Sequence, residues 1–191
     1  MRSIYSTGNH TVDEVGKIHM TGNIIPSTWY RKGEVERVAR GLYIHPDYFA
    51  DDYFITSYRL PKGVYSHESA LFLHHLSDEN PSKLVLTIPS GWNISLLQER
   101  ERYTFYYLKE ELWELGQVQV QTPYGNTVTA YSKERTLAEI LAKDEQTDRN
   151  LILQALEMGL KGKELDSLQL MKYARVFDVQ DVMRAYLEVL L

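Results

Sequence analysis

Apolar and polar positions near the start of the chain follow a helical pattern. Residues 11–14, Thr-Val-Asp-Glu, match a capping box, in which the threonine caps a backbone N–H of the first turn and the glutamate reaches back. The sequence therefore predicts a short helix that begins at Thr11 and ends near Lys17 or His19. A turn at residues 20–23 follows.

A second helix is predicted after this turn. Asn23 can serve as its N-cap, and Pro26 lies in its first turn, where the missing N–H does no harm. Ile25 and Trp29 are four positions apart and face inward. Gly33 then ends the helix as a glycine in the left-handed conformation.

The pattern becomes extended after Gly33. Residues 34–38 and 42–44 surround a bend at residues 39–41, which predicts a β-hairpin closed by Pro46. Two helices followed by a hairpin form a winged helix-turn-helix. The same pattern also fits a small α/β segment with a solvated basic edge, and local pattern alone does not separate the two.

The composition shifts toward aromatic and acidic residues after Pro46, where we place a domain boundary. Ser66 can cap a helix over residues 68–76. Four strand-like runs follow, at residues 84–88, 103–108, 118–122 and 127–131. The predicted fold class is α+β, with an N-terminal winged helix-turn-helix at residues 1–47 and a larger α/β domain at residues 48–191 that ends in helices.

The last part of the chain is predicted to be helical. One apolar face recurs with helical spacing over its final turns, and it comprises Val179, Val182, Met183, Tyr186, Leu187 and Leu190. This terminal helix has to dock against another surface. We expect that surface to be the sheet of its own domain or, as the alternative, a second copy of the chain.

Composition narrows the class of protein. Apolar residues make up 43% and charged residues 25% of the chain, as in soluble globular proteins. The first ten residues lack the apolar run of a secretory signal, and no stretch approaches the roughly 18 apolar residues of a membrane span. We therefore expect a cytoplasmic protein. The chain has no cysteine, which excludes disulfides, thiolate metal sites and cysteine nucleophiles.

The charges are distributed unevenly. The net charge of −5 disfavours nucleic acid as a partner, because phosphate binding depends on lysine and arginine. However, residues 1–50 carry six Lys and Arg against five acids, whereas residues 51–191 carry fifteen against twenty-one. Four of the six cations fall between Arg31 and Arg40. A local cluster of this kind is what a small DNA-binding domain requires.

Four segments, in this order, resemble the AbiEi-type antitoxins of abortive-infection systems, also called type IV antitoxins. They are GEVERVARGLYIHP at residues 33–46, SHESAL at 66–71 with the strand at 84–89, YSKERTL at 131–137, and the closing LEVLL at 187–191. The resemblance covers nearly the whole chain. It implies a winged helix-turn-helix joined to an α/β antitoxin domain. It further implies binding to inverted repeats upstream of the operon, and neutralisation of a nucleotidyltransferase toxin without a stable complex. Family members often open with a longer first helix, whereas ten residues precede Thr11 here.

Candidate DNA contacts follow from the predicted recognition helix and wing. A recognition helix reads base edges in the major groove, and nearby cations fix its register on phosphates. The base-reading candidates are Asn23, Ser27, Thr28 and Arg31, and the phosphate candidates are Lys32, Arg37 and Arg40. Arg40 could instead enter the minor groove. The alternative for each cation is a solvated surface charge, and for Arg37 it is an ion pair with Glu34 or Glu36. Trp29 and Tyr43 are expected in the core.

The sequence offers little support for catalysis. His67-Glu68 begins like a zinc-protease helix motif, but position 71 is leucine. His67 and His74 could share a helix face, yet a third metal ligand is missing. Nucleophile-elbow, dinucleotide-binding and phosphate-loop motifs are absent. We therefore predict no enzyme activity, cofactor or metal. An unrecognised nuclease and a protein-interaction adaptor remain the alternatives.

Residues 103–107 form a separate candidate. Three of the five are tyrosines and one is phenylalanine, and Arg100 and Arg102 come just before them. Aromatic and basic residues together are typical of RNA contacts. An edge strand packed on its sheet explains the same pattern. The operator sequence, the identity of the toxin and the oligomeric state are not encoded in any recognisable motif, and paired binding to adjacent half-sites stays open.

Overall fold

The computed structural model of the chain describes residues 10–12, 17–20, 33, 36–39, 42–44, 50–95, 97, 99–143 and 149–190. The chain divides into two compact units, the first comprising residues 1–61 and 121–128 and the second residues 62–120 and 129–191. Helices and strands are both abundant, so the coarse prediction of an α+β fold is confirmed. The predicted boundary between residues 47 and 48 stays a prediction, because both residues lie outside the described part.

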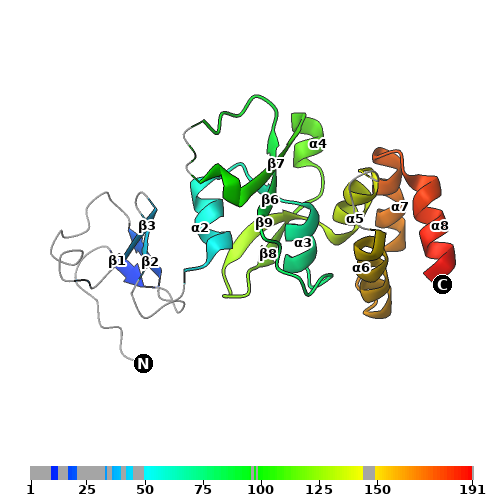
Figure 1. The fold of residues 1–191 in the computed structure, drawn as a ribbon, viewed down its shortest axis with the longest axis horizontal. Helices are drawn as coiled ribbons and strands as arrows, with labels where there is room; N and C mark the ends of the chain where they lie inside the picture. The colour runs from blue at the N-terminus through cyan, green and yellow to red at the C-terminus, as the bar shows by residue number, and fades with distance from the viewer. Residues whose placement is uncertain are drawn as a thin grey trace. The chain divides into compact units, whose positions relative to one another are not determined.

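The first unit contains an antiparallel four-stranded sheet (Figure 1). Its strands are β1 (His10–Val12), β2 (Lys17–Met20), β3 (Glu36–Ala39) and β4 (Leu42–Ile44), arranged in the order β1-β2-β4-β3. The first unit also contains helix α2 (Asp52–Arg59).

The prediction of a helix that begins at Thr11 is wrong, because this segment forms strands β1 and β2. Thr11 pairs with His19, and Val12 pairs with Ile18, as partners on β1 and β2. The capping box is a signal of only a few residues, and a helix this short gains little against the cost of its first turn. The β-branched side chains in this segment instead favour an extended backbone.

The hairpin predicted after Gly33 is confirmed. Strands β3 and β4 pair antiparallel, with Arg37 opposite Tyr43 and Ala39 opposite Leu42. The register shifts between Arg37 and Ala39. Gly33 has a φ of +70°, as a left-handed glycine requires. The second helix predicted before it lies outside the described residues.

The second unit is built on a sheet of five strands (Figure 1), of which only the adjoining ends of β8 and β9, at residues 121 and 127–128, are counted in the first unit. The strands are β5 (Val64–Tyr65), β6 (Leu84–Pro89), β7 (Tyr103–Leu108), β8 (Gln117–Gln121) and β9 (Thr127–Tyr131), in the order β7-β6-β5-β9-β8. All four strand-like runs predicted from the sequence are therefore confirmed. Strand β6 is buried along its whole length, as expected for a strand with neighbours on both edges.

Six α-helices of the second unit are described. They are α3 (His67–Leu73), α4 (Glu110–Glu114), α5 (Lys133–Leu141), α6 (Arg149–Lys161), α7 (Ser167–Val176) and α8 (Gln180–Leu190), and a 3-10 turn at Arg100–Arg102 precedes β7. The helix predicted over residues 68–76 corresponds to α3, with Ser66 at its N-cap. The helical C-terminal part is also confirmed.

A buried apolar cluster lies among these helices. It joins side chains of α3, α5, α6, α7 and α8, including Leu71, Leu137, Ile152, Leu170 and Met183. Helix α8 packs on α7 and α5, so the prediction that it packs on the sheet of its own domain is wrong. The reason is that α5 and α7 offer α8 an apolar surface.

Most of the predicted apolar face of α8 points into this cluster. Met183 is fully buried, and Tyr186, Leu187 and Leu190 pack against the cluster from its edge. Val182 is the exception, because its side chain is 43% exposed. Within the described residues, no helix is both long and apolar enough to cross a membrane.

Candidate functional site

The β3–β4 hairpin presents one buried and one open set of side chains. Along β4, Leu42 and Ile44 are buried and Tyr43 between them is half-buried, whereas Glu36 and Arg37 on β3 are both exposed. The alternation along β4 gives the hairpin one face for its core, and Arg37, opposite Tyr43, lies on the other face. The prediction that Tyr43 contributes to the core is therefore met in part.

Arg37 is the one DNA-contact candidate within the described residues. Its Nε donates a hydrogen bond to the carbonyl of Ala39 at 3.3 Å, which holds the stem of the side chain along the strand. Its predicted alternative partner Glu34 lies outside the described residues. The other predicted contacts, Asn23, Ser27, Thr28, Arg31, Lys32 and Arg40, also lie outside the described residues, as does Trp29.

Helix α2 supports the hairpin from the same unit. Arg59, at the last turn of α2, donates from Nη2 to the carbonyl of Val38 on β3 at 2.5 Å. At the other end of α2, the buried Asp51 is the N-cap, and its Oδ1 accepts from the N–H of Phe54 at 3.1 Å. The hairpin is thereby attached to a capped helix.

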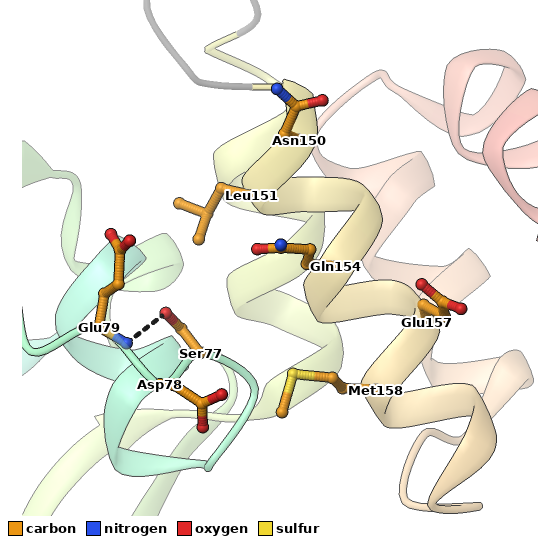
Figure 2. A pocket seen from close by; sticks show the side chains of 8 residues that line it. All are labelled: Ser77, Asp78, Glu79, Asn150, Leu151, Gln154, Glu157 and Met158. Carbon is orange, nitrogen blue, oxygen red and sulfur yellow. Dashed lines mark hydrogen bonds between the residues drawn. The ribbon is translucent and has the colours of Figure 1, made fainter.

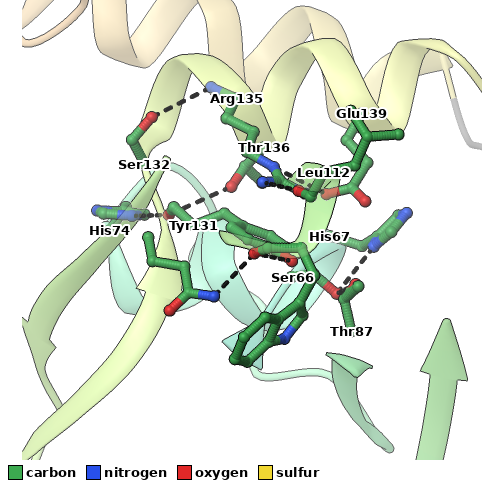
Figure 3. A network of polar contacts seen from close by, with 12 residues as sticks. Ser66, His67, His74, Thr87, Leu112, Tyr131, Ser132, Arg135, Thr136 and Glu139 are labelled. Carbon is green, nitrogen blue, oxygen red and sulfur yellow. Dashed lines mark hydrogen bonds and ion pairs between the residues drawn. The ribbon is translucent and has the colours of Figure 1, made fainter. Parts of the chain in front are cut away.

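Two segments that carry the family resemblance meet in the second unit (Figure 3). Residues 66–71 belong to the start of α3, and residues 131–137 belong to the end of β9 and the start of α5. His74, at the end of α3, lies with its Nε2 2.7 Å from the carbonyl oxygen of Tyr131. Thr136 Oγ1 also donates to this carbonyl, at 3.4 Å. The sequence places 59 residues between these two segments, and the fold brings the helices that carry them, α3 and α5, into contact.

His67 is held in an unusual position at the first turn of α3. It is 2% exposed and has a φ of +49°, a left-handed conformation that is uncommon outside glycine. Its ring stacks on Tyr106 of β7 with centroids 4.1 Å apart. Burial, together with the nearby positive charges of Lys143 and Arg135, lowers the pKa of His67 to about 3. The imidazole is therefore neutral at physiological pH.

Ser66 connects His67 to the sheet. The hydroxyl of Thr87 donates to Ser66 Oγ at 2.9 Å, and Ser66 Oγ lies 3.0 Å from Nδ1 of His67. The hydroxyl of Ser66 makes no cap hydrogen bond to the backbone of α3. The prediction that Ser66 occupies the N-cap position is therefore confirmed. Its hydroxyl, however, contacts Thr87 and His67 instead of the helix backbone.

Arg135 is fully buried at the start of α5. Its Nη1 donates to the carbonyl of Leu112 at 2.6 Å, and its guanidinium carbon lies 3.2 Å from the ring centre of Tyr131. Contact of a planar cation with an aromatic face stabilises it electrostatically. Arg135 therefore fastens α5 to the end of β9 and to α4.

Glu139 lies one helical turn after Arg135 and is 3% exposed. Its Oε2 is 3.9 Å from Nε of Arg135. Burial raises the pKa of Glu139 to about 7, although the positive charges of Arg135 and Lys143 oppose that rise. The Nζ of Lys143 in turn lies 3.0 Å from the ring centre of Tyr106.

We call the side chains of Ser66, His67, Tyr106, Arg135, Glu139 and Lys143 the buried polar cluster. Within this cluster, His67 Nε2, Glu139 Oε2, and Nε and Nη2 of Arg135 find no hydrogen-bond partner among the described residues. Perturbed pKa values of this kind are frequent at functional sites. Here His67 and Glu139 are buried, whereas Tyr106 and Lys143 are partly exposed. Its clear physical role is to join α3, α5 and β7.

Sequence reasoning missed Glu139. An arginine and a glutamate four positions apart on a helix are usually a solvated surface pair. The signal that could have revealed the burial is the apolar context, because Leu137, Ala138, Ile140 and Leu141 surround the glutamate in sequence. A helix segment that is apolar on several faces is typically buried all round.

The other sequence candidates are accounted for by the fold. His67 and His74 are both buried and bond to different groups, and the described residues contain no group of three His, Asp or Glu side chains that could hold a metal ion. Strand β7 lies at one edge of its sheet, which matches the edge-strand explanation of residues 103–107. Tyr107 is 51% exposed there.

The comparisons with known proteins give no further assignment. No family model matches the chain, and no curated protein matches its sequence.

Proposed function

We propose that this chain is an antitoxin of the type IV, abortive-infection class that also represses its own operon. Residues 1–47 act as a winged helix-turn-helix domain in which strands β1 and β2 replace the first predicted helix. It binds inverted repeats in double-stranded DNA, and two copies bind adjacent half-sites cooperatively. Residues 48–191 neutralise a nucleotidyltransferase-type toxin. The observation that supports the DNA-binding half best is the β3–β4 hairpin, which stands where the wing is predicted and exposes Arg37.

The physical argument rests on the two faces of this hairpin. Leu42 and Ile44 bury one face, so the hairpin has a fixed orientation, and Arg37 is exposed beside it. An arginine on a fixed strand donates to phosphate oxygens with little loss of side-chain freedom. Such contacts set the register of a reading helix on the duplex. Asn23, Ser27, Thr28 and Arg31 then read bases, and Lys32 and Arg40 contact phosphates.

The antitoxin half is supported by the resemblance together with the contact between residues 66–71 and 131–137. Segments that determine one shared structure are expected to pack together, and helices α3 and α5, which carry these segments, are in contact. His74, three positions after the first segment, also reaches the carbonyl of Tyr131. The structure does not support the alternative of a nuclease. Glu139 and His67, whose pKa values are perturbed as those of catalytic groups often are, are only 3% and 2% exposed. We therefore propose no catalytic residue, and the protein acts without a cofactor.

A gel-shift titration of the full chain tests the DNA-binding half. The labelled duplex is the DNA upstream of the protein's own gene, random duplex is the competitor, and the series is repeated at low and high salt. We expect specific, salt-sensitive binding. Arg31→Ala should relax the sequence preference at a cost of about 1–3 kcal/mol, whereas Lys32→Ala should weaken all duplexes alike.

Binding no stronger to the upstream DNA than to random duplex would contradict the repressor proposal. The antitoxin half has its own test, in which the chain is co-expressed with the toxin encoded beside it and growth is measured. Loss of DNA binding with full rescue would leave the antitoxin proposal standing, and the reverse result would leave only a DNA-binding regulator.

A further inference from the structure

A groove lies between α6 and the loop that follows α3 (Figure 2). Its volume is about 630 Å³, within the range of binding pockets for organic ligands and peptide side chains. One wall is formed by residues 77–79, where the N–H of Glu79 donates to Ser77 Oγ at 3.2 Å. The other wall is one side of α6.

The sequence of α6 explains why this side of the helix is open. Ile152, Ala155 and Leu156 are fully buried in the apolar cluster, so they fix which face of α6 points inward. Leu151, Gln154 and Met158 follow the helical spacing of a second face, and Figure 2 shows them directed toward the loop. Met158 remains 38% exposed.

The groove combines an apolar strip with negative charge. Met158 supplies the strip together with Leu151, which is partly buried because it also packs against the apolar cluster, and Asp78, Glu79 and Glu157 supply three carboxylates. None of the described residues that line the groove is a lysine or arginine. Glu157 is bridged at 2.5 Å by Lys161 on its own helix, whereas Asp78 and Glu79 are exposed on the loop. The loop wall therefore favours a cationic ligand.

We propose that this groove binds a basic segment of a partner protein, with one bulky apolar side chain of that segment seated between Leu151 and Met158. Lysine or arginine residues on either side of the anchor face Asp78 and Glu79. Methionine suits such a seat because its unbranched, polarizable side chain adapts to different apolar groups. The proposal concerns the second unit alone and does not depend on DNA binding.

The length of the groove favours a peptide over a compact cation. Its α6 wall extends from Asn150 to Met158, eight positions that span roughly 12 Å at a rise of 1.5 Å per residue. An extended chain covers that distance with about four residues. A small polyvalent cation would satisfy the carboxylates but would leave the apolar strip uncovered.

Fluorescence anisotropy with three labelled peptides tests this inference on the full chain. The first peptide carries one leucine flanked by lysines and arginines, the second replaces the leucine by serine, and the third replaces the basic residues by glutamate. We expect the first peptide to bind at least about fivefold more tightly than the second, since burial of a leucine side chain supports such a ratio. The third should not bind, and high salt should weaken the first.

Matched variants locate the binding. The double variant Asp78→Asn/Glu79→Gln should weaken the first peptide severalfold, whereas the double variant Glu110→Gln/Glu111→Gln, with the same change of net charge on exposed residues of α4, should not. Met158→Ser should remove the preference for leucine over serine. Leu168→Ser, at an apolar side chain that is 83% exposed on α7, should preserve that preference.

Three results would overturn the inference. Equal weakening by both acidic double variants would mean general attraction to an acidic protein. Equal affinity for the leucine and serine peptides would mean that the apolar strip binds no anchor. Competition by spermidine as strong as that by the unlabelled first peptide would mean a site for small polyvalent cations instead.

Discussion

The hydroxyl of Thr122 donates a hydrogen bond to Oδ2 of Asp51 at 2.6 Å, across 71 positions of sequence. Asn126 Nδ2 donates to the same oxygen, while Oδ1 caps α2 through Phe54. One buried carboxylate thus joins the start of α2 to the turn between β8 and β9, all within the first unit.

Replacing this carboxylate should destabilise the first unit. Asp51→Ala removes the cap of α2, which costs about 1 kcal/mol, and leaves the buried donors of Thr122 and Asn126 unsatisfied, which costs about 1–3 kcal/mol. We expect the free energy of unfolding to fall by about 2–4 kcal/mol in total. Denaturant titration gives this value, and hydrogen exchange at the amide of Phe54 should accelerate. Asp181→Ala, at an exposed residue of α8, is the control, and an equal loss there would refute the role of Asp51.

Gly116 should tolerate no side chain. It has a φ of +74°, and a Cβ built there would lie 2.8 Å from Tyr173 Oη and 3.0 Å from Arg135 Cδ. Gly116→Ala therefore adds a steric conflict beside the buried polar cluster to the strain of the left-handed backbone. We expect a loss of about 2–4 kcal/mol in unfolding free energy, measured by thermal and denaturant unfolding.

Gly91→Ala separates the two effects. Gly91 has a φ of +87° and open space around its Cβ position, so the substitution there adds backbone strain alone, about 1 kcal/mol. A loss at Gly116 no larger than that at Gly91 would show that Tyr173 and Arg135 move aside freely.

Arg37→Ala tests the wing. If the exposed guanidinium contacts a phosphate, its loss should weaken specific and random duplexes by the same factor and should reduce the slope of log affinity against log salt by about one unit. Gel shifts at several salt concentrations measure both. Arg184→Ala, which breaks an exposed ion pair with Asp181 on α8, serves as the control of equal charge. Loss of preference for the specific duplex alone would instead place Arg37 at a base edge.

Regular apolar spacing made much of the second unit predictable. Strand β6 is a run of apolar and β-branched residues, and the apolar face of α8 around Met183 follows the helical period. In both elements the pattern of buried positions is enough to predict the secondary structure. The helix prediction for residues 11–19 failed because a local cap signal competes there with β-branched side chains. The extended form of this segment also depends on pairing between Ile18 and Tyr43 of β4, which is distant in sequence.

The buried polar cluster was beyond prediction for a different reason. Its members come from α3, β7 and α5, and their contacts depend on topology rather than on spacing. Helical spacing alone places Glu139 one turn from Arg135, but only the packed structure buries both. The order of residue types along a helix cannot predict that a charged side chain is buried, because a solvated ion pair has the same spacing.

Glu139 should make stability depend on pH in a defined direction. Burial raises its folded pKa to about 7, above the ordinary value near 4.3 of the unfolded chain. Between these values the folded protein keeps a proton that the unfolded chain releases, so this group's contribution to the unfolding free energy is fully present at acid pH and falls as pH rises toward 7. The groups that interact electrostatically with it are Arg135 on α5, Lys143 just after α5, and Tyr106 on β7. On α3, His67 and Glu68 interact with the same Lys143.

The comparison with Glu139→Gln isolates this contribution. His67 acts in the opposite direction, because its lowered pKa makes the protein lose stability as pH falls below about 6.5, and both proteins share that loss. We expect the stability of the parent relative to Glu139→Gln to fall by on the order of 1–3 kcal/mol between pH 5 and pH 8. Denaturant titrations across this range measure it, with the exposed Glu188→Gln on α8 as the control. A difference that grows with pH would mean that the ion pair with Arg135 outweighs burial and holds Glu139 ionised in the folded protein.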